Sequence, residues 1–421
     1  MMRPHRTVIG SASAALAATL LLAGCGTGGE ETDDLNRAGH DEHSGEKAGA
    51  EDAEELDAPA PRLVTTYDGG IMTLDATTLE VIDDTKLEGF NRVNPVGDSR
   101  HVMVSVAEGF RLFDAGVWTE EHGDHTHSYA AAPALTDTVY ETDTPGHVVR
   151  HGGTTVLFGD GDGKIQTFDT DAFAEGAPDP QVIEAEEPHH GVAVRLEDGS
   201  TLHTIGTEEE RSGAKVVDAE GKETARSEDC PGIHGEAAAQ NEAIALGCED
   251  GILLYKDGEF SKVDAKDDYG RIGNQQGSDE SPVVLGDYKV DEDAELERPE
   301  RISLTDTEAG TMKLVDLGAS YSFRSLGRGP DGEALVLGTD GKLRVIDPKS
   351  GDIDEEYPVI DDWKEPVDWQ QARPTLFVQG EKAYVSDPEK SEIHIVDLGT
   401  GKVEKTAELP HATDEVTGVT G

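Results

Sequence analysis

From Arg62 to the C-terminus, short apolar runs alternate with polar turns. Thr155–Phe158, Ile252–Tyr255 and Ala334–Leu337 are examples, and each run is followed closely by Gly-Asp, Asp-Gly or Gly-Thr. Such runs, rich in β-branched and aromatic residues and bounded by turn residues, are typical of strands. Apolar positions at helical spacing are absent from this region of the sequence. The pattern therefore predicts an all-β protein.

The strands recur as a repeat of about forty-odd residues. The segments at 334–359 and 382–409 can be laid over each other strand by strand. A repeat of this length with four strands is typical of a β-propeller, in which each repeat forms one blade. Eight blades fit best, and seven remains open because an acidic insertion, Asp287–Glu300, blurs the count. The innermost strands should begin near Val93, His147, Gly191, His234, Pro282, Arg324 and Thr375.

The first repeat, from Leu63 to Leu87, contains only three strands. Its missing innermost strand can come from Glu415–Thr420 at the C-terminus. Pairing the two ends of the chain in this way closes the ring and leaves no open sheet edge. We therefore expect one propeller domain over residues 61–421.

The N-terminus has the features of an export signal. A basic start (Arg3, Arg6) precedes a short apolar stretch, and Leu22-Ala23-Gly24-Cys25 resembles the lipobox of bacterial lipoproteins. We expect a signal peptide over residues 1–24, a lipidated Cys25, and a flexible acidic stalk over residues 25–60. Within the stalk, His40-Asp41-Glu42-His43 either captures zinc weakly or only reflects composition. The protein should be extracytoplasmic and lipid-anchored to the cell membrane, at the cell surface or in the periplasm.

The net charge limits the classes of molecule that the protein can bind, and the cysteines predict a covalent link. The 421 residues include 35 Lys and Arg against 88 Asp and Glu, a formal net charge of −53. Such a surface repels nucleic acid and attracts cations. Two cysteines remain besides Cys25, and in an oxidising compartment Cys230 and Cys248 should form a disulfide. A metal site that uses both thiolates is the alternative.

One stretch, Glu121–His127, concentrates the chemistry of metal binding. His122, Asp124, His125 and His127 are imidazole and carboxylate ligands of the kind that zinc accepts. Gly123 favours a loop that would allow them to converge. The alternative is a solvated polar loop that is incidentally rich in histidine.

A second set of histidines follows the repeat. His147, His190 and His234 lie about 43 residues apart, which is one repeat, and each comes at the start of a blade. Equivalent positions of consecutive blades are neighbours around the channel, so the three imidazoles should meet in a zinc site. The alternative for each is a hydrogen bond to backbone at the channel mouth. The fourth ligand is open: His411, a histidine of the 122–127 stretch, or Asp124.

Other polar residues have a structural interpretation. His101, His203 and His394 lie within expected strands and are taken as structural. The stretch Asp160-Gly161-Asp162-Gly163 is interpreted as a hairpin turn, since it lacks the downstream glutamate of a calcium loop.

Seven motifs, in order along the chain, resemble the AztD-type zinc metallochaperones, which are exported β-propeller proteins that accompany a zinc ABC importer. They are EEHGDHTH, PGHVVRHGG, PHHGVAV, CPGIHGEAA, GRIGNQQGS, SYSFRSLGRGP and LPHATDEVTGVTG. The resemblance implies zinc sites on the propeller and direct transfer of Zn²⁺ to the importer's solute-binding protein. We expect a monomer that acts by ligand exchange, without chemistry on a substrate. It carries the metal role to His122, His125, His127, His147, His190 and His234. The stalk has fewer histidines than the leaders of such proteins.

Two other functions remain open. Three histidines and a water around zinc would also suit a hydrolase or a lyase, with Glu236 as the candidate general base. A propeller used only as an interaction surface, with incidental histidines, would bind no metal tightly.

Overall fold

A computed structural model describes residues 53–421. The expected signal peptide, Cys25 and His40–His43 lie outside the described residues. The described chain is built of β-strands and two short 3-10 helices, η1 (Thr170–Glu175) and η2 (Gln240–Glu242). Within it, no helix has the length and apolar character needed to cross a membrane. The all-β prediction is confirmed.

Eight sheets of the described residues have four antiparallel strands each, and we interpret each of them as one blade. From the inside outwards, blade one contains β35 (Val416–Val419), β2 (Arg62–Tyr67), β3 (Gly70–Asp75) and β4 (Val81–Lys86). Blade two contains β5 (Arg92–Pro95), β6 (His101–Val106), β7 (Gly109–Asp114) and β10 (Ala134–Glu141). Blade three contains β11 (Pro145–His151), β12 (Thr154–Gly159), β13 (Lys164–Asp169) and β14 (Gln181–Glu184). Blade four contains β15 (Ala193–Arg195), β16 (Thr201–Gly206), β17 (Arg211–Val217) and β18 (Glu223–Ser227).

The second half of the chain continues in the same way. Blade five contains β19 (His234–Ala239), β20 (Ala243–Cys248), β21 (Gly251–Lys256) and β22 (Glu259–Asp264). Blade six contains β23 (Gln275–Gln276), β24 (Val283–Asp287), β25 (Arg301–Asp306) and β26 (Thr311–Asp316). Blade seven contains β27 (Leu326–Arg328), β28 (Ala334–Leu337), β29 (Lys342–Ile346) and β30 (Ile353–Pro358). Blade eight contains β31 (Leu376–Gln379), β32 (Lys382–Asp387), β33 (Glu392–Asp397) and β34 (Lys402–Glu408).

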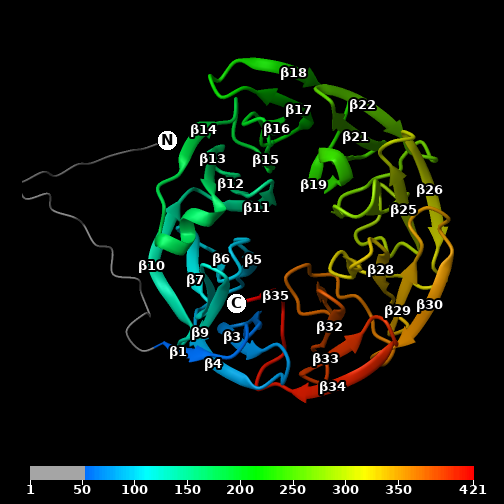
Figure 1. Ribbon diagram of the computed structural model, residues 1–421. Helices are drawn as coiled ribbons and strands as arrows, with labels where there is room; N and C mark the ends of the chain where they lie inside the picture. Colours follow the sequence, from blue (N-terminus) through cyan, green and yellow to red (C-terminus); the bar gives the residue numbers. More distant parts are fainter. Residues whose placement is uncertain (1–52) are drawn as a thin grey trace, which may run out of the picture. The chain divides into compact units, whose positions relative to one another are not determined.

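The hydrophobic core is divided among the gaps between consecutive blades. Val64 of blade one packs with Val104 of blade two, and Leu63 of blade one packs with Ile393 and Ile395 of blade eight. An inner strand such as β2 thus buries side chains on both faces, one face toward each neighbouring blade, whereas outer strands such as β4 and β34 are largely exposed. In Figure 1, β11, β15, β19 and β35 face the centre, while β14, β18, β22 and β26 lie at the outside.

The C-terminal strand β35 pairs with the N-terminal strand β2. The register runs antiparallel from Arg62 opposite Val419 to Thr65 opposite Val416. The side-chain hydroxyl of Thr65 also donates to the backbone carbonyl of Glu415, at 2.7 Å. This pairing satisfies backbone groups that β2 would otherwise expose at a sheet edge.

In blade six, the innermost strand is not the segment that the sequence predicts. Its innermost strand is Gln275–Gln276, and the strand that follows Pro282 is the second strand of the blade. A two-residue polar strand has no alternation of apolar and polar positions, so the sequence pattern did not reveal it.

A hairpin is inserted between β7 and β10 of blade two. It consists of β8 (Val117–His122) and β9 (His125–Ala130), and β1 (Glu54–Leu56) adds a third strand along β9. The expected stalk was to end at residue 60, yet its residues 54–56 form this strand. Backbone hydrogen bonds to an available edge can order a segment without large apolar side chains.

The expected disulfide joins Cys230 to Cys248.

Candidate metal centres

The structure brings His147, His190 and His234 together at the inner ends of blades three, four and five. His147 lies in β11, His190 in the turn before β15, and His234 is the first residue of β19. The ring centroids are 4.9 Å apart for His147 and His190, 5.0 Å for His190 and His234, and 5.8 Å for His147 and His234. We call these three residues the channel group.

Backbone carbonyls orient two of the three rings. His147 Nδ1 donates to the carbonyl of Gly191 at 2.8 Å, and His234 Nδ1 donates to the carbonyl of Gly273 at 2.5 Å. A carbonyl only accepts hydrogen bonds, so each Nδ1 atom carries the hydrogen. The Nε2 atom of each neutral ring is therefore the one with the free lone pair, which is the form that binds a metal.

A carboxylate orients the third ring. His190 Nδ1 lies 2.5 Å from Asp160 Oδ2, and Asp160 Oδ1 accepts a hydrogen bond from the backbone N–H of Gly191. A histidine that donates to a carboxylate becomes a better metal ligand through its other nitrogen. Gly146 leaves room for this carboxylate, because a Cβ atom at position 146 would collide with Asp160.

The free nitrogens of the channel group converge on one point. His190 Nε2 and His234 Nε2 are 3.1 Å apart, and one ligand atom from each of the three histidines lies within 4.8 Å of the others. At this distance one nitrogen can donate a hydrogen bond to the other, or both can bind one cation through their lone pairs. Zn–N bonds of about 2.0–2.1 Å in a tetrahedron separate two ligand nitrogens by about 3.3 Å. The spacing of these two nitrogens therefore fits a zinc ion.

Burial keeps two members of the channel group, His147 and His234, in the neutral form. Desolvation, reinforced by the neighbouring imidazoles, lowers the pKa of His147 well below its usual value and lowers that of His234 to about 3. Neutral imidazole is the ligand form, so protons do not compete for these two nitrogens at neutral pH. His190 is the most accessible of the three, with 43% of its side chain exposed.

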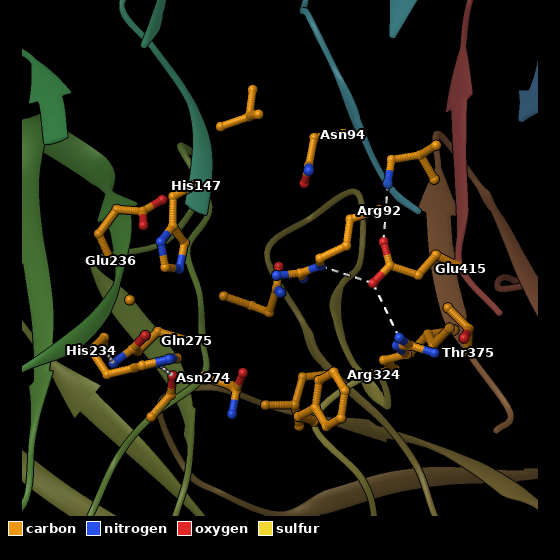
Figure 2. Close-up of a pocket in the computed structure, with 18 of the residues that line it drawn as sticks. Arg92, Asn94, His147, His234, Glu236, Asn274, Gln275, Arg324, Thr375 and Glu415 are labelled. Atoms are coloured by element: carbon orange, nitrogen blue, oxygen red, sulfur yellow. Dashed lines mark hydrogen bonds and ion pairs between the residues drawn. The ribbon is translucent and has the colours of Figure 1, made fainter. Parts of the chain in front are cut away.

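A cavity of about 300 Å³ adjoins the channel group. Figure 2 shows His147, His234 and Glu236 on one side of it and Arg324 and Glu415 on the opposite side. Burial raises the pKa of Glu236 to about 8, so this carboxyl group is mainly protonated at neutral pH.

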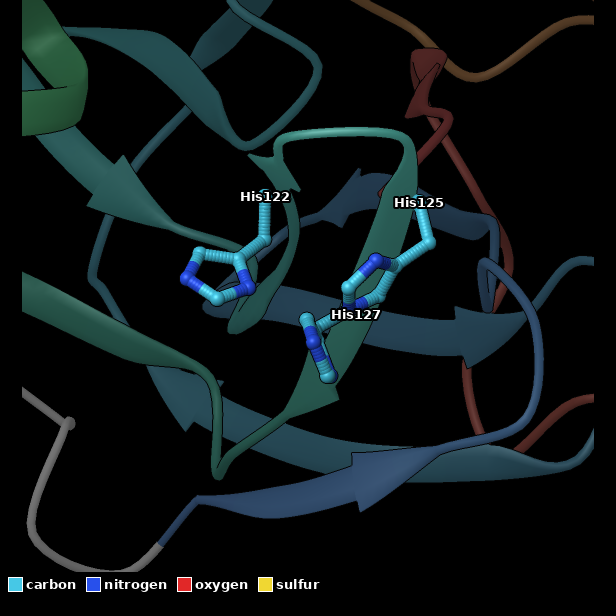
Figure 3. Close-up of side chains that lie close together, drawn as sticks. All are labelled: His122, His125 and His127. Carbon is cyan, nitrogen blue, oxygen red and sulfur yellow. The ribbon is translucent and has the colours of Figure 1, made fainter.

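The second concentration of histidines lies on the β8–β9 hairpin. His122 pairs with His125 across a two-residue turn, in which Gly123 has a φ of +71°. The ring of His127 is 4.8 Å from that of His125 and 5.7 Å from that of His122. Figure 3 shows the three rings turned toward a common space, and their ligand atoms lie within 4.8 Å of one another. We call them the hairpin group.

The hairpin group is open to solvent. His122 and His125 are exposed and His127 is half-buried. His127 Nδ1 lies 2.6 Å from Glu55 Oε1 of β1, which fixes that ring against the N-terminal strand. Asp124, a predicted metal ligand, is fully exposed, and its Oδ1 lies 3.1 Å from His125 Nδ1. Asp124 thus lies next to the group and outside it.

Neither expected source of a fourth ligand reaches the channel group. His411 stacks on the ring of Tyr67 at 3.9 Å, and its Nε2 atom lies 3.3 Å from Asp84 Oδ2. The hairpin histidines form a group of their own. Among residues 53–421, no other histidine or acidic residue joins the three channel histidines as a potential ligand.

The sequence pattern does not indicate two residues that orient histidines. Asp160 lies in the hairpin turn that the sequence predicts, and the turn also places its carboxylate against His190. Glu55 was assigned to the stalk, and no signal in the sequence indicated that it would reach His127. The spacing between Asp160 and His190 is shorter than one repeat, so the repeat could not indicate their contact.

No known family profile matches the sequence. The zinc chaperone AztD of Citrobacter koseri is 29% identical over 349 residues, which are 79% of this chain and 80% of that protein. A crystal structure of Citrobacter koseri AztD matches with a TM-score of 0.74 at 25% identity, over 86% of this chain and 98% of that chain. The structure of apo AztD gives a TM-score of 0.73 at 24% identity, with the same coverage.

A more distant structure shares the fold alone. The dihydro-heme d1 dehydrogenase NirN matches with a TM-score of 0.54 at 12% identity, over 86% of this chain and 75% of that chain. The prediction of a β-propeller is confirmed by these likenesses together with the four-stranded sheets. The resemblance to the AztD-type zinc chaperones that the seven motifs indicated is likewise confirmed, in sequence and in fold.

Proposed function

We propose that this protein is an extracytoplasmic zinc metallochaperone. It binds Zn²⁺ through its histidine groups and transfers the ion to the solute-binding protein of a zinc ABC importer. The similarity to a protein named as a zinc chaperone supports this function. Zinc is the cargo, so the protein performs no chemistry on a substrate.

The observation that carries the proposal is the arrangement of the channel group. Its three Nδ1 atoms are all held by acceptors, the Nε2 atoms of His190 and His234 are 3.1 Å apart, and one ligand atom of each histidine lies within 4.8 Å of the others. Three rings fixed in this way lose little freedom when an ion binds, which favours high affinity. The negative surface potential expected from a net charge of −53 attracts the cation to the protein.

Transfer requires a position that a partner can reach. The channel group supplies three nitrogens to an ion that prefers four ligands, and His190 is exposed on one side. A ligand from the partner can therefore bind the ion before the last histidine leaves. The exposed hairpin group offers a second place where such an exchange can begin.

The cellular location follows from the N-terminal sequence. Under this proposal, residues 1–24 are removed, Cys25 carries lipid, and the segment up to β1 connects the anchor to the propeller domain. The Cys230–Cys248 disulfide suits an oxidising compartment outside the cytoplasm.

A zinc hydrolase or lyase is the second candidate, because three histidines leave one coordination position free. It would need a general base beside the ion. Glu236 is the residue in the right place, and burial raises its pKa to about 8, close to the pH at which a general base works. The similarity to a protein named as a zinc chaperone is what favours binding and transfer over catalysis.

The first test is the zinc content of the mature chain with Cys25→Ser, purified without a metal-affinity tag. Zinc should remain bound in the presence of a competing chelator, and a variant with His147, His190 and His234 all replaced by alanine should lose it. His411→Gln is the matched control, since His411 lies outside both groups, and it should keep the parent's zinc content. A parent chain that gives up all its zinc to a weak chelator would overturn the proposal.

The second test addresses transfer. The zinc-loaded chain is mixed with the apo solute-binding protein, and the ion is followed after the two proteins are separated. Direct transfer should proceed faster than zinc dissociates into excess chelator. Equal rates would mean that zinc passes through solution, and the chaperone function would be wrong.

A further inference from the structure

A third group of potential metal ligands lies far from the first two in sequence. Asp387 ends β32, Glu392 begins β33, and His394 follows two residues later, so the group surrounds the β32–β33 turn of blade eight. One ligand atom from each residue lies within 4.8 Å of the other two. On β33, Val396 is on the same face and packs against blade seven. The group therefore faces the gap between blades seven and eight.

The two carboxylates of this group oppose each other. Asp387 is directly opposite Glu392 in the antiparallel register, and Asp387 is only 6% exposed. Like charges in such a cross-strand pair are destabilising, more so where water is excluded. A cation between the two carboxylates would remove the repulsion.

The imidazole of the group lacks a hydrogen-bond partner on its inner nitrogen. His394 is 6% exposed, its Nδ1 atom lies 2.9 Å from Thr406 Oγ1, and its Nε2 atom makes no hydrogen bond. The Nε2 atom is 3.7 Å from Glu392 Oε2, which is too far for a hydrogen bond. Buried polar atoms are rarely left unpaired, and this one is directed at two carboxylates.

Blade seven shows how a neighbouring blade fills the same position. Arg344 of β29 occupies the position of His394: it lies opposite Val336 of β28, as His394 lies opposite Val385 of β32. Arg344 binds Asp340 at 2.8 Å and Glu356 at 3.2 Å, so a guanidinium neutralises the carboxylates there. Blade eight has a neutral imidazole at this position and retains two carboxylates.

One lysine is close to the group but neutralises it only in part. Lys390 Nζ lies 2.9 Å from Asp361 and 3.5 Å from Asp387. Asp361 is the nearer partner, and the Lys390 side chain is 43% exposed. One ammonium group is thus shared between two carboxylates, those of Asp361 and Asp387.

We propose that Asp387, Glu392 and His394 bind a divalent metal ion, which holds blade eight together where blade seven uses Arg344. Two carboxylate oxygens and one imidazole nitrogen suit Zn²⁺ or Mn²⁺. The site is structural and separate from the channel and hairpin groups. It does not depend on the proposed zinc transfer.

The test compares the parent chain with His394→Arg, a change that copies the arrangement of blade seven and so preserves the fold. Each protein is dialysed against Zn²⁺ and its metal content is measured. The parent should bind one ion more per chain than His394→Arg. Glu389→Gln, an exposed residue of the same turn, is the matched control and should retain the parent's number. Equal metal content in the parent and His394→Arg would overturn the proposal.

A second measurement uses Mn²⁺, which favours oxygen ligands over clusters of histidine. Bound Mn²⁺ is followed by the loss of the free-ion electron paramagnetic resonance signal, and the melting temperature is recorded with and without the ion. Mn²⁺ should raise the melting temperature of the parent and leave that of His394→Arg unchanged. An identical response of the two proteins to Mn²⁺ would show that this group binds no metal.

Discussion

The channel group and the hairpin group present three imidazoles in opposite surroundings. The channel histidines come from three blades, and each Nδ1 atom is held by a backbone carbonyl or by the carboxylate of Asp160. The hairpin histidines come from one turn, and the carboxylates beside them, Asp124 and Glu55, are themselves exposed. The same side chain is thus part of a rigid scaffold in one place and of an accessible turn in the other.

The difference separates two properties that a carrier of zinc needs. Rings fixed before the ion arrives favour tight binding, because little conformational entropy is lost. Exposed rings on a turn allow another protein to approach the ion. We infer that the channel group determines how firmly zinc is held and that the hairpin group affects mainly how quickly it is exchanged.

The largest effect should come from removing a channel ligand. His190→Ala should abolish tight binding at this group, with a loss larger than the roughly 10–100-fold that removing an outer partner causes. His122→Ala, in the hairpin group, should leave the tight site intact. Titration against a zinc chelator measures both variants. If His122→Ala and His190→Ala weakened the tightest site equally, the division between the two groups would be wrong.

The next largest effect on zinc affinity should come from Asp160, whose carboxylate contacts Nδ1 of His190. Asp160→Asn keeps the shape of the side chain but removes the charge that strengthens the imidazole as a ligand, so zinc affinity should fall by about 10–100-fold. Asp162→Asn is the control, because Asp162 lies in the same turn and binds Thr142 without touching a histidine. The same chelator titration applies. Equal affinities for the two variants would contradict the orienting role of Asp160.

A buried histidine outside both groups shows what burial alone does to the pKa of an imidazole, without neighbouring histidines in a group. His203 is 1% exposed, and desolvation, followed by the charge of Lys215, lowers its pKa to about 4. In the unfolded chain this histidine takes up a proton near pH 6.5, whereas in the folded chain it stays neutral until the pH is near 4. The free energy of unfolding therefore decreases as the pH falls below 6.5. Between pH 7 and 5.5 the loss should be about 1 kcal/mol.

Urea unfolding at the two pH values, with and without His203→Gln, measures this contribution. The parent should lose more stability on acidification than the variant does. An equal loss in both proteins would mean that His203 does not titrate in this way.

The smallest effect should come from Glu55. Its carboxylate is 60% exposed, so its pair with His127 should contribute about 1 kcal/mol or less. In a chain that carries His190→Ala, Glu55→Gln should weaken zinc binding at the hairpin group a few-fold at most. Glu54→Gln is the control on the same strand. A loss as large as that of Asp160→Asn would show that the hairpin group is as firmly organised as the channel group.

The sequence predicts the contacts between residues at equivalent positions of consecutive repeats. His147, His190 and His234 were placed together because equivalent residues of consecutive blades are neighbours in a propeller. Contacts made by turns and by the N-terminal strand follow no repeat, so Asp160 and Glu55 were missed. The repeat does not indicate that His411 stacks on Tyr67, because this contact depends on where blade one lies after the chain ends meet. The sequence pattern gives His394 a structural interpretation, since only the folded hairpin brings Asp387 and Glu392 close to it.

The pairing of β35 with β2 also has a consequence for the order of folding. The hydrogen bond between Thr65 and Glu415 joins residues 350 positions apart, and such contacts form slowly because a long loop must close first. Glu415 then binds Arg92 and Arg324 on the side of the channel opposite His147. We therefore expect that side to assemble late, after the blades that carry the histidines have folded from more local contacts. A newly folding chain can form its imidazole cluster while the channel around it is still open.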